Sequence, residues 1–387
     1  MRYRDSIFVN LLKPISRRQF RSIVERHEGD AYDKSFGSWE HMVALIFAHL
    51  GGADSLRGVV AAWNAQAHHH YHLGAGRLAR STLSDANVRR PPEVFAATFT
   101  MLSAQADREL RRQGTEMLRL IDATPIPLGK LCAWADWNGR THGLKLHVVY
   151  DPGADHPRRI EVTSATVNDV EIGRAQPIEP QAIYVFDKGY CDYAWWIRLH
   201  QAGARFVTRP KANATYRVVG RRALADRTGD GFTVLEDADV ELTTQGKRQL
   251  ALPMRRVRVR RQDGAALTFI TNDLNSAAGE IAAWYKARWQ IELLFRWIKQ
   301  HLKLRKFLGR CENAIRLQIL AAMIAYLLLR IAARASRSTL PAIRFAQLVG
   351  QCLFVRKSIA RIDRPPETNP STPRPFAVLG QLAFRYV

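Results

Sequence analysis

The chain has few cysteines and no long apolar segment. Its four cysteines are spread over 387 residues without the spacing of a metal site or a disulfide framework. This usage suits a reducing cytosol. The longest apolar run, 317–329, contains Gln318 and falls short of the roughly 20 residues that a membrane-spanning helix needs. We therefore expect a buried core helix at this position.

Acidic residues are scarce relative to basic ones. The chain has 58 Lys and Arg against 35 Asp and Glu, which gives a formal net charge of +23 and a pI near 10.4. Such a chain collects on polyanions, and nucleic acid is the default partner. An anionic membrane surface is the weaker alternative. The N-terminal residues lack the apolar core of a secretory signal, so we expect a cytoplasmic protein without a membrane partner.

Residues 1–115 are predicted to be mostly helical. Ser16, Ser38 and Ser55 each stand where an apolar helical pattern begins, as helix-capping residues do. Residues 81–90 are predicted to be a polar, basic connector before a last helix from Pro92. Several short, arginine-rich helices suit a DNA-binding domain, and a plain helical scaffold is the alternative.

From about residue 117 the pattern changes to short strands. The expected strands are 117–121, 145–150, 159–163, 183–186 and 205–208, and the expected helices are 169–175 and 192–201. The order β-β-β-α-β-α-β predicts an α/β fold in which a mixed sheet is flanked by helices, as in an RNase H-like core. We assign this catalytic domain to residues 116–335.

Within that domain, residues 212–270 are predicted to form a separate β-rich insertion. Arg256, Arg258 and Arg260 alternate with valines, so all three are expected on one strand face. That face is either solvated or in contact with phosphates. One helix is then predicted over 276–308. Residues 336–387 form a basic C-terminal segment.

Carboxylates follow two of the predicted strands. Asp122 comes directly after one apolar run and Asp187 after another. Sites form where neighbouring strands of an α/β sheet end, so these two side chains point into one cleft if the strands are neighbours. Glu292 on the predicted helix can supply a third carboxylate. Three hard oxygen ligands suit Mg²⁺ or Mn²⁺, and a two-ion site can catalyse phosphodiester chemistry.

The same helix carries a second pattern. Tyr285, Arg288, Glu292 and Lys299 project within about 60° of one another at about 100° per residue, so they share one face. A single carboxylate among phosphate-binding groups is poorly explained as a core stripe. The face fits a place where a metal and a nucleic-acid backbone meet.

Four segments together resemble a known family. They are Ile121-Asp122-Ala-Thr124, Phe186-Asp187-Lys-Gly189-Tyr190, Phe206-Val-Thr-Arg209-Pro-Lys211 and Tyr285-x2-Arg288-x3-Glu292-x6-Lys299. They look like a bacterial insertion-sequence transposase of the DDE type, in the group named for its Tyr-Arg-Glu-Lys signature. The resemblance covers roughly residues 1–335. The signature spacing is strongly specific, whereas either Asp motif alone is weak.

The resemblance implies roles for the site residues. Asp122, Asp187 and Glu292 would be catalytic and would bind two Mg²⁺ or Mn²⁺ ions. A second group, Tyr285, Arg288 and Lys299, would hold DNA phosphates near the cut. Arg209 and Lys211 could clamp the DNA backbone, with plain surface charge as the alternative. Asp169 resembles a further acidic position of the family, or else it caps the helix that follows.

It also implies a function and partners. The expected activity is metal-dependent cleavage at the ends of an insertion element, followed by strand transfer into target DNA. The partners would be double-stranded terminal inverted repeats and target DNA, held by a dimer in the bacterial nucleoid. A hairpin-ended intermediate is described for the group. The alternatives are a nuclease of the same fold without strand transfer, and a cleavage-dead repressor that occupies DNA ends.

Overall fold

The computed structural model describes most of the chain. The described residues are 5–31, 35–52, 54–110, 116–129, 132–137, 139, 142–224, 228–229, 231–243, 252–301 and 307–363. Residues 302–306 of the helix predicted over 276–308, and residues 364–387 of the basic C-terminal segment, lie outside this set.

A ten-stranded sheet forms the centre of the fold. The strands are β1 (Leu118–Pro127), β2 (Gly143–Asp151), β3 (His156–Ser164), β4 (Ile183–Phe186), β5 (Arg205–Thr208), β6 (Thr215–Arg221), β7 (Thr228–Gly229), β8 (Phe232–Thr243), β9 (Met254–Arg261) and β10 (Ala266–Thr271). Their order is β3-β2-β1-β4-β5-β10-β9-β8-β6, with β7 paired to β8. The molecule is thus a mixed α/β protein built on one large sheet.

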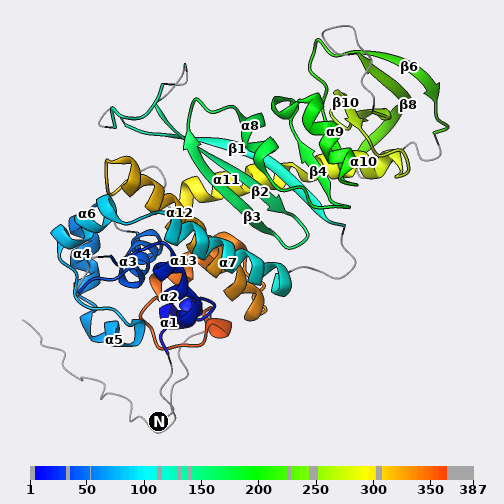
Figure 1. The fold of residues 1–387 in the computed structure, drawn as a ribbon. Helices are drawn as coiled ribbons and strands as arrows, with labels where there is room; N and C mark the ends of the chain where they lie inside the picture. Colours follow the sequence, from blue (N-terminus) through cyan, green and yellow to red (C-terminus); the bar gives the residue numbers. More distant parts are fainter. Residues whose placement is uncertain are drawn as a thin grey trace, which may run out of the picture.

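The first five strands follow the order expected from the sequence. Strands β1, β4 and β5 are parallel to one another, whereas β2 and β3 pair antiparallel. Helix α8 (Asp169–Ala175) connects β3 to β4, and α9 (Tyr193–Gln201) connects β4 to β5. In Figure 1 both helices lie beside this part of the sheet.

Alternation along β1 sends its side chains to two different cores. Leu118 and Leu120 belong to the larger cluster, which also contains apolar residues of α11 (Trp289–His301). Ile121 belongs to the second cluster, together with Trp195 and Trp196 of α9. Asp122 and Thr124 therefore project on the face that α11 covers, because they share the parity of Leu120.

The predicted insertion is not a separate sheet. Its last strand, β10, pairs antiparallel with β5, so the inserted strands extend the same sheet. Within the insertion, residues 232–243 form one long strand, β8, with a register shift between Val234 and Glu236. A local apolar pattern cannot reveal that the sheet continues through such an irregularity.

The helical part combines both ends of the chain. Its helices are α1 (Ile7–Leu12), α2 (Arg17–Arg26), α3 (Ser38–Gly51), α4 (Leu56–Asn64), α5 (His70–Leu73), α6 (Arg80–Arg89), α7 (Glu93–Leu110), α12 (Glu312–Ala335) and α13 (Ala342–Gln351). Ser16 and Ser55 accept the capping hydrogen bonds expected of them, from Gln19 N and Gly58 N. Ser38 is not a cap, because it is the first residue of α3 and the capping position is Gly37. The connector expected at 81–90 is wrong, because α6 occupies nearly all of it.

Helix α12 contains the apolar run noted in the sequence. Among the described helices it alone is long and apolar enough to cross a membrane, but 89% of its most apolar window is buried. It packs against α3 and α7 (Figure 1). The expectation of a buried core helix is confirmed.

The helix predicted over 276–308 is two helices. Helix α10 (Ala278–Ala287) is followed by Arg288 as its C-terminal cap, and α11 begins at Trp289. The N–H groups of Arg288 and Ile291 donate to carbonyls three residues earlier, which tightens the backbone at this point. The two helices run end to end in Figure 1, so the motif residues stay in one region although the helix is interrupted.

Candidate active site

The first two predicted acids lie side by side. Ile121 of β1 pairs in parallel register with Phe186 of β4, and Asp122 and Asp187 follow directly. Neighbouring strands are about 5 Å apart, so the two acids begin from adjacent positions. The two strands are neighbours, which was the condition for a shared cleft. The prediction that the first strand ends at Asp122 is wrong, because β1 continues to Pro127 through its pairing with β2.

Local backbone contacts hold Asp187 in place. Its side chain accepts a hydrogen bond from Gly189 N at 2.7 Å, and its carbonyl accepts one from the Thr208 hydroxyl at 3.2 Å. A Cβ added at Gly189 would lie 2.9 Å from the Asp187 carboxylate oxygen, closer than real Cβ contacts. The small residue two places after the acid therefore leaves room for this carboxylate.

Arg288 brings the third acid to the first. Its Nη1 donates to Asp122 Oδ2 at 3.1 Å and its Nη2 donates to Glu292 Oε1 at 2.6 Å. Glu292 lies in the first turn of α11, where the helix dipole favours a negative charge. One guanidinium thus links two of the three predicted acids, although Asp122 lies 166 residues before Arg288 in the sequence.

The pKa of Asp122 reflects its burial and the charges of the two other acids. Burial raises the pKa of Asp122 to about 6, and the charges of Asp187 and Glu292 act in the same direction. The Ala123 N–H and Arg288 oppose this rise. A carboxylate that is buried beside two others is short of positive charge, and a divalent cation could supply it.

Lys299 binds a residue that sequence reasoning missed. Its Nζ donates to the Thr124 hydroxyl at 2.6 Å, and Thr124 is buried. Thr124 stands two residues after Asp122 and so lies on the same strand face. The spacing of two residues in the Asp122-Ala-Thr124 motif could therefore have predicted that Thr124 lies beside the site.

Two tyrosines lie close to the acids. Tyr285 is buried, and its ring packs 4.7 Å from that of Phe269 between centroids. Burial raises the pKa of Tyr285, Arg288 and Arg209 oppose the rise, and Asp187 adds to it, so the tyrosine lies near the site. Burial likewise raises the pKa of Tyr190, with further contributions from Asp169, Asp122 and Asp187. The Tyr190 hydroxyl is buried without a hydrogen-bond partner in the described part of the chain.

The remaining predicted residues lie around this group. Arg209 and Lys211 are exposed just after β5, and Lys211 Nζ contacts the Cys191 carbonyl at 3.4 Å. Asp169 is the first residue of α8 rather than its cap, which is Asn168. Its carboxylate pairs with Lys145 at 2.9 Å.

The donor chemistry suits a hard divalent cation, but the side chains are not yet arranged as ligands. Within the described ranges, no three His, Cys, Asp or Glu side chains converge on a point that could hold an ion. Arg288 takes one oxygen each from Asp122 and Glu292. The Arg288 guanidinium therefore occupies the point where two of the three expected metal ligands meet.

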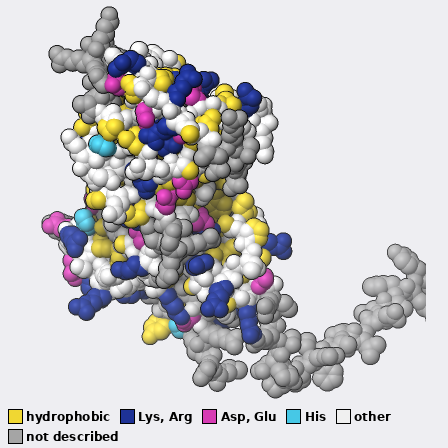
Figure 2. All heavy atoms as spheres, turned by 90° about the vertical axis from the view of Figure 1, so that its right-hand side faces the viewer, with side chains coloured by type: hydrophobic (Ala, Val, Ile, Leu, Met, Phe, Trp, Pro, Cys, Tyr) yellow, Lys and Arg dark blue, Asp and Glu magenta, His cyan; other side chains and the backbone are white. Residues whose placement is uncertain are grey.

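Surface charge alone does not mark one track for DNA. Figure 2 shows separate groups of Lys and Arg side chains on the face viewed, with Asp and Glu between them. On β9, Arg256 and Arg258 both pair with Glu236, so two of the three alternating arginines are engaged within the protein.

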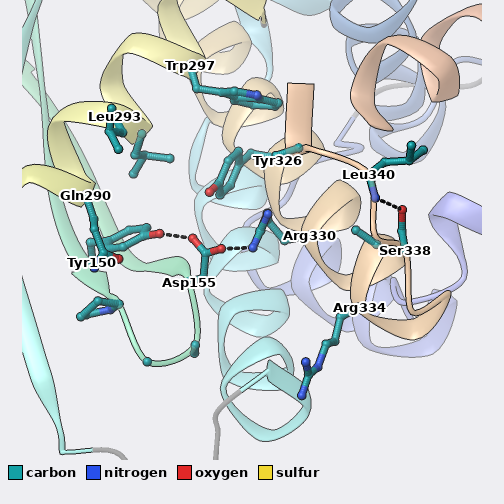
Figure 3. A pocket seen from close by; sticks show the side chains of 16 residues that line it. Tyr150, Asp155, Gln290, Leu293, Trp297, Tyr326, Arg330, Arg334, Ser338 and Leu340 are labelled. Atoms are coloured by element: carbon teal, nitrogen blue, oxygen red, sulfur yellow. Dashed lines mark hydrogen bonds and ion pairs between the residues drawn. The ribbon is translucent and has the colours of Figure 1, made fainter. Parts of the chain in front are cut away.

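A cavity of about 620 Å³ lies away from the acids. It is lined by α11, α12, the turn between β2 and β3, and the residues before α13. Figure 3 shows Tyr150, Asp155 and Arg330 linked in a row along one wall, below Trp297 and Tyr326. Gln290, Leu293 and Trp297 turn toward this cavity, whereas Glu292 of the same helix turns toward Arg288.

Comparisons with known proteins give a consistent result. A family model described as a transposase DDE domain matches residues 113–328, and a domain of unknown function (DUF4372) matches residues 3–76. The putative transposase y4zB of Sinorhizobium fredii (strain NBRC 101917 / NGR234) is 58% identical over 305 residues, which cover 79% of this chain and 86% of that protein.

Two further relatives are more distant. The probable transposase for insertion sequence element IS5377 of Geobacillus stearothermophilus is 30% identical over 66% of this chain and 68% of its own length. The putative transposase for insertion sequence element IS4SA of Synechocystis sp. (strain ATCC 27184 / PCC 6803 / Kazusa) is 27% identical over 65% and 71%. A solved piggyBac transposase synaptic complex with hairpin DNA aligns over 94% of this chain and 81% of that chain with a TM-score of 0.46 and 9% identity, which is too distant to support an argument.

Proposed function

The chain belongs to the transposase DDE domain family, and from this premise we propose that Asp122, Asp187 and Glu292 are its catalytic residues. The protein is a DNA transposase of the insertion-sequence type, an enzyme that cleaves DNA and transfers strands. The observation that carries the assignment is the pairing of Ile121 with Phe186, which puts two acids on adjacent strands, with Glu292 tied to the first through Arg288.

The catalytic domain is proposed to be an RNase H-like core. The strand order β3-β2-β1-β4-β5, with parallel β1, β4 and β5 and helices on both faces, supports this proposal. Residues 116–335 would form this domain and 212–270 its insertion. The helices within residues 1–115 would bind DNA, and the basic segment 336–387 would add positive charge.

The family generally uses divalent metal ions, and we propose that this chain holds two, Mg²⁺ or Mn²⁺, between the three acids. The fit rests on the donor set, which is all carboxylate oxygen, and on the raised pKa of Asp122 beside two further acids. When bound, such ions activate a water or a 3′-hydroxyl and stabilise the leaving oxygen of a phosphodiester.

The surrounding residues would position the DNA. Arg288 can fork onto two phosphate oxygens, and Lys299 can act as a point charge further along α11. Tyr285 would offer a hydroxyl donor, and the exposed Arg209 and Lys211 would contact the backbone beyond β5. The DNA would comprise terminal inverted repeats and a target, held by a dimer in the cytoplasm. Affinity should fall steeply with salt as phosphate contacts release counterions.

The test uses purified full-length protein and DNA that carries the element's own ends. We expect nicking only with Mg²⁺ or Mn²⁺, and joined product when pre-cut ends and a target plasmid are supplied. The changes Asp122→Asn, Asp187→Asn and Glu292→Gln should each abolish cleavage and leave end binding largely intact.

The control is Asp263→Asn, which removes an exposed carboxylate from the turn between β9 and β10. It should cut like the unchanged protein. Normal cutting by Glu292→Gln would show that the catalytic acids are misassigned.

A further inference from the structure

Arg288 is held inside the group of acids rather than displayed on the surface. Only 19% of its side chain is exposed, and its two terminal nitrogens donate to Asp122 and Glu292. A guanidinium presents its donors in a rigid fork, and here the fork is filled by carboxylates. The group expected to hold a phosphate is thus already bound to two other anions.

The second cation of the signature is also folded back onto β1. Lys299 donates to Thr124, two residues from the acid that binds Arg288. Both cations therefore contact the short segment from Asp122 to Thr124. The segment and Arg288 together connect Asp122 and Glu292 to both cations of the signature.

In this arrangement Arg288 and a divalent ion would compete for the same carboxylate oxygens. A divalent ion that uses Asp122 Oδ2 or Glu292 Oε1 would meet the positive charge of Arg288 at the same oxygens. A DNA phosphate that takes the Arg288 fork must in turn draw it away from these carboxylates. The ion would displace Arg288 from the carboxylates and so free it for a phosphate, and the phosphate would hold Arg288 away from the oxygens that the ion needs.

We propose that Arg288 is the internal counter-ion of the acid group and that it exchanges Asp122 and Glu292 for a DNA phosphate when a divalent ion binds. Ion binding and DNA binding then reinforce each other. The reinforcement is reciprocal, because a coupling free energy between two sites acts equally in both directions. This inference rests on the proposed function, since it takes Asp122 and Glu292 as metal ligands.

The first experiment measures Mn²⁺ binding to full-length protein without DNA, by electron paramagnetic resonance of the free ion. Arg288→Ala removes the competing cation, so Mn²⁺ should bind about tenfold more tightly than to the unchanged protein, within the usual range of such couplings. The matched control is Arg296→Ala, an exposed arginine on the same helix whose ring contact is with Trp289. It should change Mn²⁺ affinity little. Unchanged or weaker Mn²⁺ binding by Arg288→Ala, relative to this control, would overturn the exchange.

The second experiment measures the affinity of a fluorescein-labelled 20-base-pair duplex by anisotropy, with and without Mn²⁺ at constant ionic strength. Mn²⁺ should raise duplex affinity for the unchanged protein and for Arg296→Ala. For Arg288→Ala this gain should vanish. A gain that persists in Arg288→Ala contradicts the coupling.

Two further variants keep the outcomes separate. Arg288→Lys retains one charge but cannot bridge both acids, so its Mn²⁺ affinity should lie between those of Arg288→Ala and the unchanged protein; it serves as the test if Arg288→Ala fails to fold. Asp122→Asn should lose Mn²⁺ binding. If Asp122→Asn binds Mn²⁺ normally, the proposed metal site itself fails; if it loses Mn²⁺ while both Arg288 variants behave like the control, only the exchange fails.

Discussion

Two arginines, each bound by two carboxylates, lie at different places along strand β1: Arg119 belongs to the strand, and Arg288 contacts it from the junction of α10 and α11 through Asp122. Arg119 donates to Asp151 at 3.0 Å, to Glu179 at 2.6 Å and to the Leu118 carbonyl at 2.9 Å. Its side chain is 1% exposed, and its Nε is also bonded to Glu179. Every nitrogen of this guanidinium has a partner within the protein.

Arg288 has the same number of acidic partners but a different setting. Its side chain is 19% exposed, and its Nε is buried without a partner in the part of the chain that the structure describes. Its acids differ as well. The pKa of Glu179 is lowered, because the hydrogen bonds and charge of Arg119 outweigh burial, whereas burial raises the pKa of Asp122 to about 6 despite Arg288.

The difference separates a structural cluster from a functional one. Around Arg119 a second arginine, Arg158, lies 3.9 Å from Asp151 and 3.5 Å from Glu179, and every guanidinium nitrogen of Arg119 has a partner, which favours one arrangement. Arg288 pairs with two of the three acids, and the charge of Asp187 also acts on Asp122, which leaves the group short of positive charge and able to accept other partners. The same pairing of one arginine with two acids, at two places around one strand, therefore serves different purposes.

The largest expected effect is on catalysis. Replacing Asp122 with Asn should lower DNA cleavage by at least about a thousandfold, or about 4 kcal/mol of transition-state stabilisation. Unfolding in urea should show a protein no less stable than the original, because a neutral amide replaces a carboxylate whose ionisation is disfavoured by burial. If Asp122→Asn still cleaves DNA, or unfolds at lower urea than the original protein, the acids around Arg288 are not a functional cluster.

The second effect is on stability and concerns the two arginines directly. Arg119→Met removes the nearer charge partner of Asp151, which is 1% exposed, and should cost about 3–5 kcal/mol. Arg288→Met affects a partly exposed group and should cost about 1 kcal/mol or less. Urea unfolding of both variants measures the contrast, and equal losses would show that the clusters do not differ as argued.

The third effect is a pH dependence of opposite sign at the two clusters. The folded-state pKa of Asp122, about 6, lies above its ordinary value of 3.8. Its contribution to stability is therefore present below pH 4 and is lost as pH rises through 6, by about 3 kcal/mol. Glu179 has a lowered pKa, so its contribution is present above its ordinary value of 4.5 and is lost as pH falls below it.

The measurement compares unfolding free energies of the unchanged protein with those of Asp122→Asn and Glu179→Gln from pH 3.5 to 8. The advantage of Asp122→Asn should grow as pH rises, and the deficit of Glu179→Gln should shrink as pH falls. Parallel curves for all three proteins would contradict both assignments.

The smallest effect concerns cations outside both clusters. Arg209→Ala and Lys211→Ala should each reduce the slope of log affinity against log salt by about 0.9 for duplex DNA, if each contacts one phosphate. Anisotropy over a salt series measures this slope, with Arg344→Ala on α13 as the control. An unchanged slope would leave Arg209 and Lys211 as ordinary surface charge.

The sequence alone was sufficient for several features of this protein. The charge excess indicated a polyanionic partner, and the apolar runs before Asp122 and Asp187 predicted strands that the structure contains. Capping by Ser16 and Ser55 could be read locally, because a cap and its helix are separated by three residues. The four-residue signature led to the family, because its spacing is short and specific.

The tertiary structure decided what lies across long separations in sequence. It joined β10 to β5 and so made one sheet of the core and its insertion, and it packed α12 against helices from the other end of the chain. It also brought Arg288 to Asp122 and Lys299 to Thr124. Local periodicity specifies which face of a helix or strand a side chain occupies, but its partner depends on how whole elements pack, and that information is distributed over the entire chain.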